Sequence, residues 1–184
     1  VAFIISGRMV ATTTKSLRNK STGIRVLFVL GNFNQGGAER QALYLAQWLK
    51  ENLQATVSFY AFSGPGAVTD ELDRLGISWK TIDFSFYFIN HYKKNTFSKE
   101  SLSYRLKLRQ QRKMFAAAID TFAPDIVLPY TYYPNVVCGM SWRFSRARAC
   151  VWNQRDIGND GITGYVPEKI ALNETSFFLS NSSQ

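Results

Sequence analysis

Two short segments combine residue types that could bind a negatively charged ligand. The first, Gly31–Glu39, is rich in glycine and lies between a predicted strand and a predicted helix. Free backbone N–H groups and the helix dipole favour an anion there, and the adjacent Gly36 and Gly37 let the backbone approach a ligand closely. The second, Asn153–Asp156, follows another predicted strand and contains Arg155, whose guanidinium can bind a phosphate or a carboxylate. A pairing of Arg155 with a nearby aspartate inside the chain is the alternative.

Two well-known anion-binding motifs do not match the glycine-rich segment. A P-loop requires Lys and Ser or Thr after its second glycine, and Gly37 and Ala38 occupy those positions. A dinucleotide fingerprint requires Gly-x-Gly-x-x-Gly and an acidic residue about 20 positions later, and neither is present. NTPase and NAD-dependent chemistry are therefore disfavoured. Glu39 lies in the first turn of the predicted helix, where a carboxylate interacts favourably with the dipole, so we expect a structural role for it.

A third candidate segment, residues 130–135, is rich in tyrosine. Tyr130 and Tyr132 follow a predicted strand, and their rings could stack on a sugar while their hydroxyls bond to it. Packing of the rings beneath the next helix explains the same residues equally well.

The chain has few residues suited to metal or nucleophilic chemistry. His91 is the single histidine, and the spacing of Cys138 and Cys150 matches no zinc or redox motif. We therefore expect no metal and no cofactor, and two buried thiols in a reducing compartment.

Strand and helix patterns alternate from residue 24 onward. The predicted strands span residues 24–30, 56–62, 77–82, 125–128, 149–152 and 177–180, and the predicted helices span residues 38–50, 68–75, 99–122, 133–144 and 169–173. This alternation predicts an α/β fold with a Rossmann-like, doubly wound parallel sheet of about six strands. Ligands of such sheets bind beyond the carboxyl ends of the strands, at the switch point between the first and fourth strands. All three candidate segments lie at that edge.

The positive charge of the chain is unevenly distributed. The 184 residues carry a net charge of +9, yet two segments, residues 1–25 and 91–113, hold most of the excess cations. That pattern fits an anionic membrane surface or an anionic substrate better than a nucleic acid, for which no recognition motif is present. No apolar run reaches the ~18 residues that a membrane-spanning helix needs.

The predicted helix at residues 99–122 has two faces of different character. One face is an apolar stripe suited to the core: Tyr104, Leu108, Phe115, Ile119 and Phe122. The opposite face combines leucines with cations: Leu102, Leu106, Arg109 and Lys113. We expect this second face to contact a membrane surface or a lipid acceptor. A solvated basic face with incidental leucines is the alternative.

The first 23 residues differ in composition from the rest. Residues 11–23 are rich in Ser, Thr, Lys and Asn, and no signal-peptide pattern is present. We interpret residues 1–23 as a flexible basic tail or as residues added ahead of the native start, and residues 24–184 as the folded domain.

The strand at residues 24–30, followed by Asn-Gln-Gly-Gly-Ala-Glu-Arg-Gln at residues 34–41, closely resembles the start of family 4 glycosyltransferases. These are retaining enzymes with the two-domain GT-B fold. A looser match covers residues 24–184, including Pro124–Val127 and Leu179–Asn181. The resemblance implies that residues 24–184 are the N-terminal, acceptor-binding half of a GT-B enzyme. It places the glycine-rich loop near the donor diphosphate, and Arg155 at the position of a family His or Arg.

The resemblance implies transfer of a sugar from a nucleotide-sugar donor to a glycan or a lipid-linked acceptor. The substrate-binding residues expected from position and resemblance together are Gln35, Gly36, Gly37, Tyr130, Tyr132, Arg155 and Asp156. The C-terminal donor domain, with its Glu-x7-Glu motif, has no counterpart here, so we expect this chain alone to be inactive. We expect a cytoplasmic protein, or one that is peripheral on the inner membrane face. The alternatives are a non-catalytic glycan- or membrane-binding half-domain that pairs with a separate donor-domain chain, a nucleic-acid binder, and a nucleotide-dependent oxidoreductase.

Overall fold

A computed structural model describes residues 23–82, 102–154 and 166–180. Within helix residues 102–104 only the backbone is described, so the predicted roles of the Leu102 and Tyr104 side chains lie outside the described part. The predictions for residues 1–22, Arg155 and Asp156 also lie outside the described residues, backbone included.

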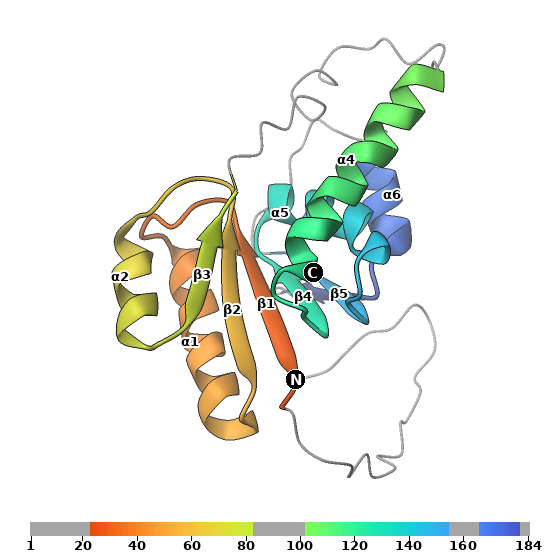
Figure 1. Cartoon of the computed structure of the whole chain (residues 1–184). Helices are drawn as coiled ribbons and strands as arrows, with labels where there is room; N and C mark the ends of the chain where they lie inside the picture. Colours follow the sequence, from red (N-terminus) through yellow and green to blue (C-terminus); the bar gives the residue numbers. More distant parts are fainter. Residues whose placement is uncertain (1–22, 83–101, 155–165, 181–184) are drawn as a thin grey trace, which may run out of the picture.

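Six parallel strands form one sheet in the order β3-β2-β1-β4-β5-β6 (Figure 1). The strands are β1 (Arg25–Leu30), β2 (Thr56–Ala61), β3 (Ser78–Thr81), β4 (Ile126–Pro129), β5 (Ala149–Gln154) and β6 (Phe177–Ser180). The chain winds outward from β1 to one edge, crosses back, and continues from β4 to the other edge. The predicted Rossmann-like sheet of about six strands is confirmed, with its switch point between β1 and β4.

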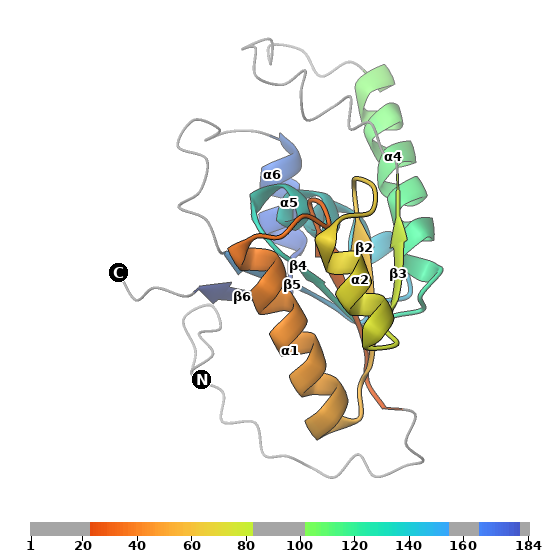
Figure 2. The ribbon, with the colours of Figure 1, turned by 90° about the vertical axis from the view of Figure 1, so that its left-hand side faces the viewer.

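Helices cover both faces of this sheet (Figure 1, Figure 2). One face carries α1 (Gly37–Leu53) and α2 (Ala67–Arg74). The other carries α4 (Leu102–Asp120), α5 (Tyr132–Ser141) and α6 (Val166–Glu174), with a short 3₁₀ turn, η1 (Trp142–Phe144), after α5. Because both faces are covered, the central strands are apolar along nearly their whole length rather than alternating. In β1 all residues after Arg25 are buried, and Phe28 stacks on Phe59 of β2 at 4.9 Å between ring centroids.

The apolar stripe predicted for α4 packs where it was expected. Leu108, Phe115 and Ile119 are buried, and Phe122 is half-buried just beyond the helix end. The opposite face is exposed, including Leu106, whose exposed fraction is 57%. The amphipathic pattern therefore predicted the orientation of this helix correctly.

The prediction that β5 stops at residue 152 was wrong. The strand continues to Gln154, and Asn153 and Gln154 pair with Leu179 and Ser180 of β6. Neighbouring strand β6 supplies the backbone partners, so two polar residues that resemble loop residues in the sequence remain in the sheet. Asn153 is consequently a buried strand residue rather than part of an exposed loop.

Candidate functional site

The carboxyl ends of β1 and β4 form the centre of the candidate site. The two strands pair in register, with Val29 opposite Pro129, and the chain then leaves them in opposite directions. After β1 it enters α1 on one face of the sheet, and after β4 it enters α5 on the other. The N-termini of two helices therefore flank this edge, as expected for a doubly wound sheet.

The glycine-rich loop leaves the start of α1 open. Gly36 is the N-cap in an extended conformation, and no side chain in the described part of the chain caps it. A Cβ atom added to Gly37 would meet nothing within 4 Å. The Glu39 carboxylate lies beside Gly36, in the first turn of the helix. This placement fits the structural role expected for Glu39, while the N–H groups at the helix start can still receive an anion.

The rest of the loop is held firmly by its neighbours. Phe33 is fully buried, and its ring meets Trp79 edge-on at 5.4 Å between centroids. Its carbonyl accepts a hydrogen bond from the backbone N–H of Val68, at 3.0 Å, which satisfies the first turn of α2. A Cβ on Gly66 would overlap this carbonyl, so only glycine permits the close approach of the two loops. The loop is thus positioned before any ligand binds.

Tyr130 lies in the core, at the end of β4. Its side chain is 1% exposed, and its ring packs on Phe28 at 6.0 Å between centroids. The structure thus gives the ring the packing role that was weighed against sugar stacking. A contact between Tyr130 and substrate stays a prediction.

Tyr132 and Thr131 form the entry to α5. Thr131 is the N-cap and has a positive φ of 70°, an uncommon conformation for a residue with a branched side chain. Tyr132 is half-buried and lies near Glu168 of α6. Burial raises the pKa of Glu168, and the neighbouring Tyr132 hydroxyl acts in the opposite direction. The predicted role of Tyr132 in substrate binding stays a prediction.

Sequence reasoning missed a pair of buried asparagines at the same edge. The Asn135 side chain in α5 is fully buried, and its Nδ2 donates to the carbonyl of Asn153 at 3.0 Å. The backbone N–H of Asn153 in turn donates to Oδ1 of Asn135, also at 3.0 Å. The pair fixes the end of β5 against α5. Asparagine in both segments was the available signal, but their contact depends on the crossover and is not visible in the sequence.

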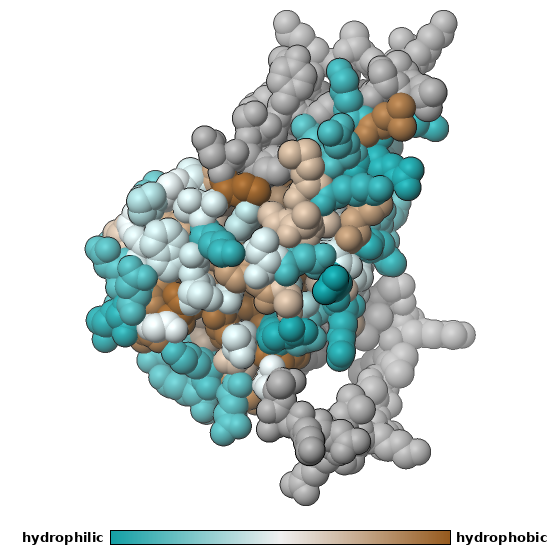
Figure 3. Space-filling view, in the orientation of Figure 1, coloured by the Kyte–Doolittle hydropathy of each residue, from teal (hydrophilic) through white to brown (hydrophobic). Residues whose placement is uncertain are grey.

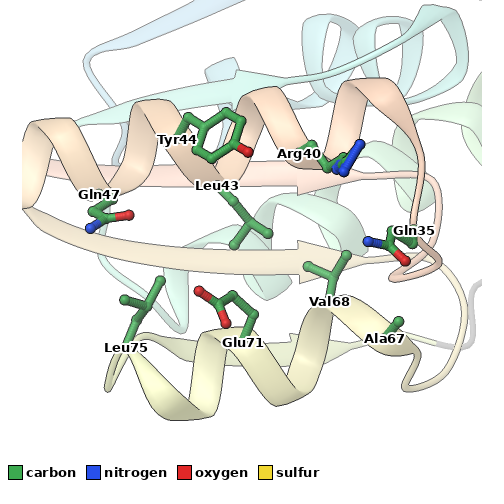
Figure 4. A pocket seen from close by; sticks show the side chains of 9 residues that line it. All are labelled: Gln35, Arg40, Leu43, Tyr44, Gln47, Ala67, Val68, Glu71 and Leu75. Atoms are coloured by element: carbon green, nitrogen blue, oxygen red, sulfur yellow. The ribbon is translucent and has the colours of Figure 1, made fainter.

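A cleft between α1 and α2 opens next to the glycine-rich loop (Figure 4). It has a volume of about 360 Å³ and is lined by aliphatic, amide and charged side chains: Gln35, Arg40, Leu43, Tyr44, Gln47, Ala67, Val68, Glu71 and Leu75. Gln35 lies at the end of the cleft formed by the helix N-termini (Figure 4). The structure therefore places Gln35 and Gly36 together, at the mouth of a concave surface.

The outer face of α4 is a shallow apolar and basic groove. It is lined by Leu106, Arg109, Gln110, Lys113, Met114 and Ala117. Met114 is 54% exposed, and Arg109 and Lys113 are exposed beside it. Figure 3 shows hydrophilic and apolar residues interspersed on this side of the molecule. Within the described residues, no helix is long and apolar enough to cross a membrane.

No protein-family model matches this chain, and no curated protein matches it. Several solved structures, in contrast, are similar to it. A glycosyltransferase from Rickettsia africae matches with a TM-score of 0.52 and 20% identity, over 78% of this chain and 32% of that one. MurG from Acinetobacter baumannii matches with a TM-score of 0.54 and 15% identity, over 84% of this chain and 40% of that one. The chain has the fold of a GT-B half-domain.

At these identities the likeness concerns the fold. This chain spans 32% and 40% of the lengths of the two proteins that it matches. The six-stranded, all-parallel sheet with helices on both faces is the architecture that the sequence resemblance implied. Membership of family 4 and retention of configuration stay predictions.

Proposed function

We propose that this chain is the acceptor-side half of a family 4, retaining glycosyltransferase. The complete enzyme would move a sugar from a nucleotide-diphosphate donor to a glycan or lipid-linked acceptor. The observation that supports this most strongly is the open helix start at Gly36–Gly37, located at the switch point of a glycosyltransferase-like sheet. We assign this half to binding and charge stabilisation, and we name no nucleophile in it.

The chemistry of the site would be electrostatic. As the bond between sugar and diphosphate breaks, negative charge develops on the leaving diphosphate. The N–H groups at the start of α1 point along the helix dipole and would stabilise that charge without reorganising. Arg155 and Asp156, expected nearby from sequence, lie outside the described residues.

A bulky side chain at position 37 tests this proposal. Gly37→Val adds atoms where the fold has open space, so we expect the thermal stability of the chain to change little. The same atoms would cover the helix N-terminus, and we expect binding of pyrophosphate and UDP to weaken about tenfold or more. Binding is followed by amide chemical shifts in ¹⁵N-labelled full chain, where the N–H groups of residues 37–39 should respond most.

Gly64→Val is the matched control, because a Cβ on Gly64 also meets nothing within 4 Å. It should leave binding unchanged. Pyrophosphate that shifts no amide at the start of α1, or binds Gly37→Val as well as the native chain, would contradict the proposal. Glycan binding without sugar transfer, even when a donor-domain chain is added, would favour the non-catalytic half-domain.

We further propose that the outer face of α4 contacts an anionic membrane. Exposed Leu106 and Met114 lie among the exposed cations Arg109 and Lys113, a combination that suits the boundary between lipid headgroups and acyl chains. Such a contact would bring the chain to a lipid-linked acceptor. The sequence predicts that Leu102 belongs to the same face, but its side chain lies outside the described part of the structure.

Vesicle co-sedimentation tests the membrane contact. The native chain should bind vesicles containing phosphatidylglycerol, and should bind pure phosphatidylcholine vesicles weakly. Arg109→Glu should reduce binding about thirtyfold, since reversing one charge near an anionic surface is worth roughly 2 kcal/mol. Arg146→Glu is the control, because Arg146 is exposed and lies at the C-terminal end of α4, beside Asp120, and does not line the groove. Equal losses for the two variants would show that net charge, rather than the face of α4, governs binding.

A further inference from the structure

The side chain of Asn153 has an unusual environment. It is 1% exposed, and within the described residues neither its Oδ1 nor its Nδ2 has a hydrogen-bond partner. Burying an amide without partners is costly, and native proteins seldom retain one without a reason. The orphaned atoms belong to a residue at the ligand edge of the sheet.

The surrounding structure holds Asn153 in place but does not satisfy its side chain. Asn135 uses both ends of its own amide on the backbone of Asn153, in two hydrogen bonds of 3.0 Å. Two buried amides therefore meet at this point with different roles. Asn135 positions the strand, whereas the side chain of Asn153 has its whole hydrogen-bonding capacity unused.

The strand register indicates which face of the sheet Asn153 occupies. Side chains two residues apart in a strand lie on the same face, and Val151 packs against the core beneath α1 and α2. Tyr130, which belongs to that same core, pairs directly with Asn153. The Asn153 amide thus lies on the α1 side of the sheet, two strands along from β1, whose following loop leads into Gly36–Gly37.

We propose that the Asn153 amide binds a pair of neighbouring hydroxyl groups of a sugar. A primary amide presents one acceptor oxygen and two N–H donors, and hydroxyl groups both donate and accept, so the two are complementary. An anion is a poor match, because its negative charge would lie close to the partly negative carbonyl oxygen of the amide. This inference rests on the proposed function: the phosphate part of the ligand lies at the start of α1, and the neutral sugar part lies at Asn153.

The amide is covered in this structure, so the proposal requires the carboxyl edge of the sheet to open locally before a sugar can reach it. Binding by the isolated chain is therefore weakened by the fraction of molecules that are open. A method that detects weak complexes residue by residue is required.

The test compares Asn153→Leu with the native chain. Leucine has nearly the same shape and removes two unsatisfied polar atoms, so the melting temperature should stay equal or rise. The probes are the methyl glycosides of glucose, galactose, mannose and N-acetylglucosamine. Their binding is followed in the full chain through the side-chain NH₂ resonances of Asn153 and, in both the native chain and the variant, through the backbone N–H resonances of Asn135 and Gln154. We expect at least one glycoside to shift these resonances, and expect Asn153→Leu to weaken its binding about tenfold or more.

Ser141→Ala is the matched control, because the Ser141 hydroxyl is also buried without a partner within the described residues but lies at the far end of α5. It should leave sugar binding unchanged. A fall in melting temperature for Asn153→Leu would show that the amide is structural, and would overturn the inference. So would glycosides that shift no Asn153 resonance, or that bind the leucine variant equally well. Pyrophosphate shifts at residues 37–39 are measured in the same samples. If the pyrophosphate shifts are present while no glycoside binds at Asn153, this inference fails and the proposed function stands. If the pyrophosphate shifts are absent as well, the proposed function fails too.

Discussion

At the scale of single residues, Asp125 joins the amino ends of three central strands. Its carboxylate accepts a hydrogen bond from the backbone N–H of Arg25 at 3.0 Å and pairs with the guanidinium of Arg25 at 3.2 Å. Its carbonyl accepts from the N–H of Arg148, at 2.8 Å, just before β5. The side-chain hydrogen bond with Arg25 is the largest cause that lowers the pKa of Asp125 below its ordinary value of 3.8, and the bond from the Arg25 backbone N–H and the charges of Arg25 and Arg148 act in the same direction.

The direction of this pKa shift predicts a pH dependence of stability. The folded state favours the ionised carboxylate, so its contribution is fully present above the ordinary pKa of 3.8 and is lost as the pH falls toward the lower pKa of the folded chain. We expect Asp125→Asn to be less stable than the native chain at pH 7, and expect the difference to shrink at pH 3. Urea unfolding at both pH values measures this. A difference that is constant with pH would mean that the charge of Asp125 contributes nothing.

At the scale of elements, Arg112 connects α4 to both helices beside it. Its Nη2 donates to both carboxylate oxygens of Glu174 in α6, at 2.6 Å each, and its Nε donates to the carbonyl of Met140 in α5. The guanidinium also lies over the ring of Phe144, at 4.6 Å. With side-chain exposures of 14% for Arg112 and 25% for Glu174, the ion pair is largely shielded from water.

Removing this guanidinium should loosen the packing of three helices. We expect Arg112→Ala to lower the free energy of unfolding by about 2–4 kcal/mol, because Glu174 and the Met140 carbonyl lose a partly buried partner. Arg112→Lys should recover only part of that stability, since a lysine ammonium cannot reach both the Glu174 carboxylate and the Met140 carbonyl as the planar guanidinium does. Arg109→Ala, one turn away and exposed, should change stability by about 0.5 kcal/mol or less. Equal effects of the alanine variants in chemical unfolding would contradict the assignment.

The same elements show what the sequence could and could not predict. The strands and their order followed from apolar runs and alternation, and the α4 core stripe followed from a 3.6-residue period. The end of β5 could not be predicted from the sequence, because polar Asn153 and Gln154 remain in the strand only through pairing with β6. The α5 prediction ran on to Phe144, whereas the α-helix ends at Ser141 and the last turn tightens to 3₁₀. At the site, the glycine loop was visible as a motif, whereas the contact between Asn135 and Asn153 required the fold.

At the scale of the whole molecule, the two thiols report on the integrity of one core cluster. Cys138 of α5 and Cys150 of β5 are free and fully buried. Burial raises the pKa of both, and for Cys138 the nearby Cys150 raises it further. The thiolate is the reactive form, so the raised pKa and the burial of the sulfur atoms both protect these residues from reaction.

We predict that both thiols react with an aromatic disulfide reagent only when the fold opens. At pH 8 the reaction of the native chain should be slower than that of the chain in guanidinium by roughly a thousandfold or more, as expected for a domain of ordinary stability. Absorbance of the released thiolate gives both rates. Rapid reaction of either cysteine in the native chain would show that this side of the sheet opens locally.

The strand order also has a consequence for how the chain acquires its structure. β1, β2 and β3 are consecutive in sequence and can pair early, but the other side of β1 must wait for β4, since Arg25 and Asp125 are 100 positions apart. During synthesis at roughly 5–20 residues per second, the most apolar strand of the sheet would have one unpaired edge for roughly 5–20 seconds. Such an edge recruits other strands, so aggregation during expression should be governed by how quickly β4 arrives.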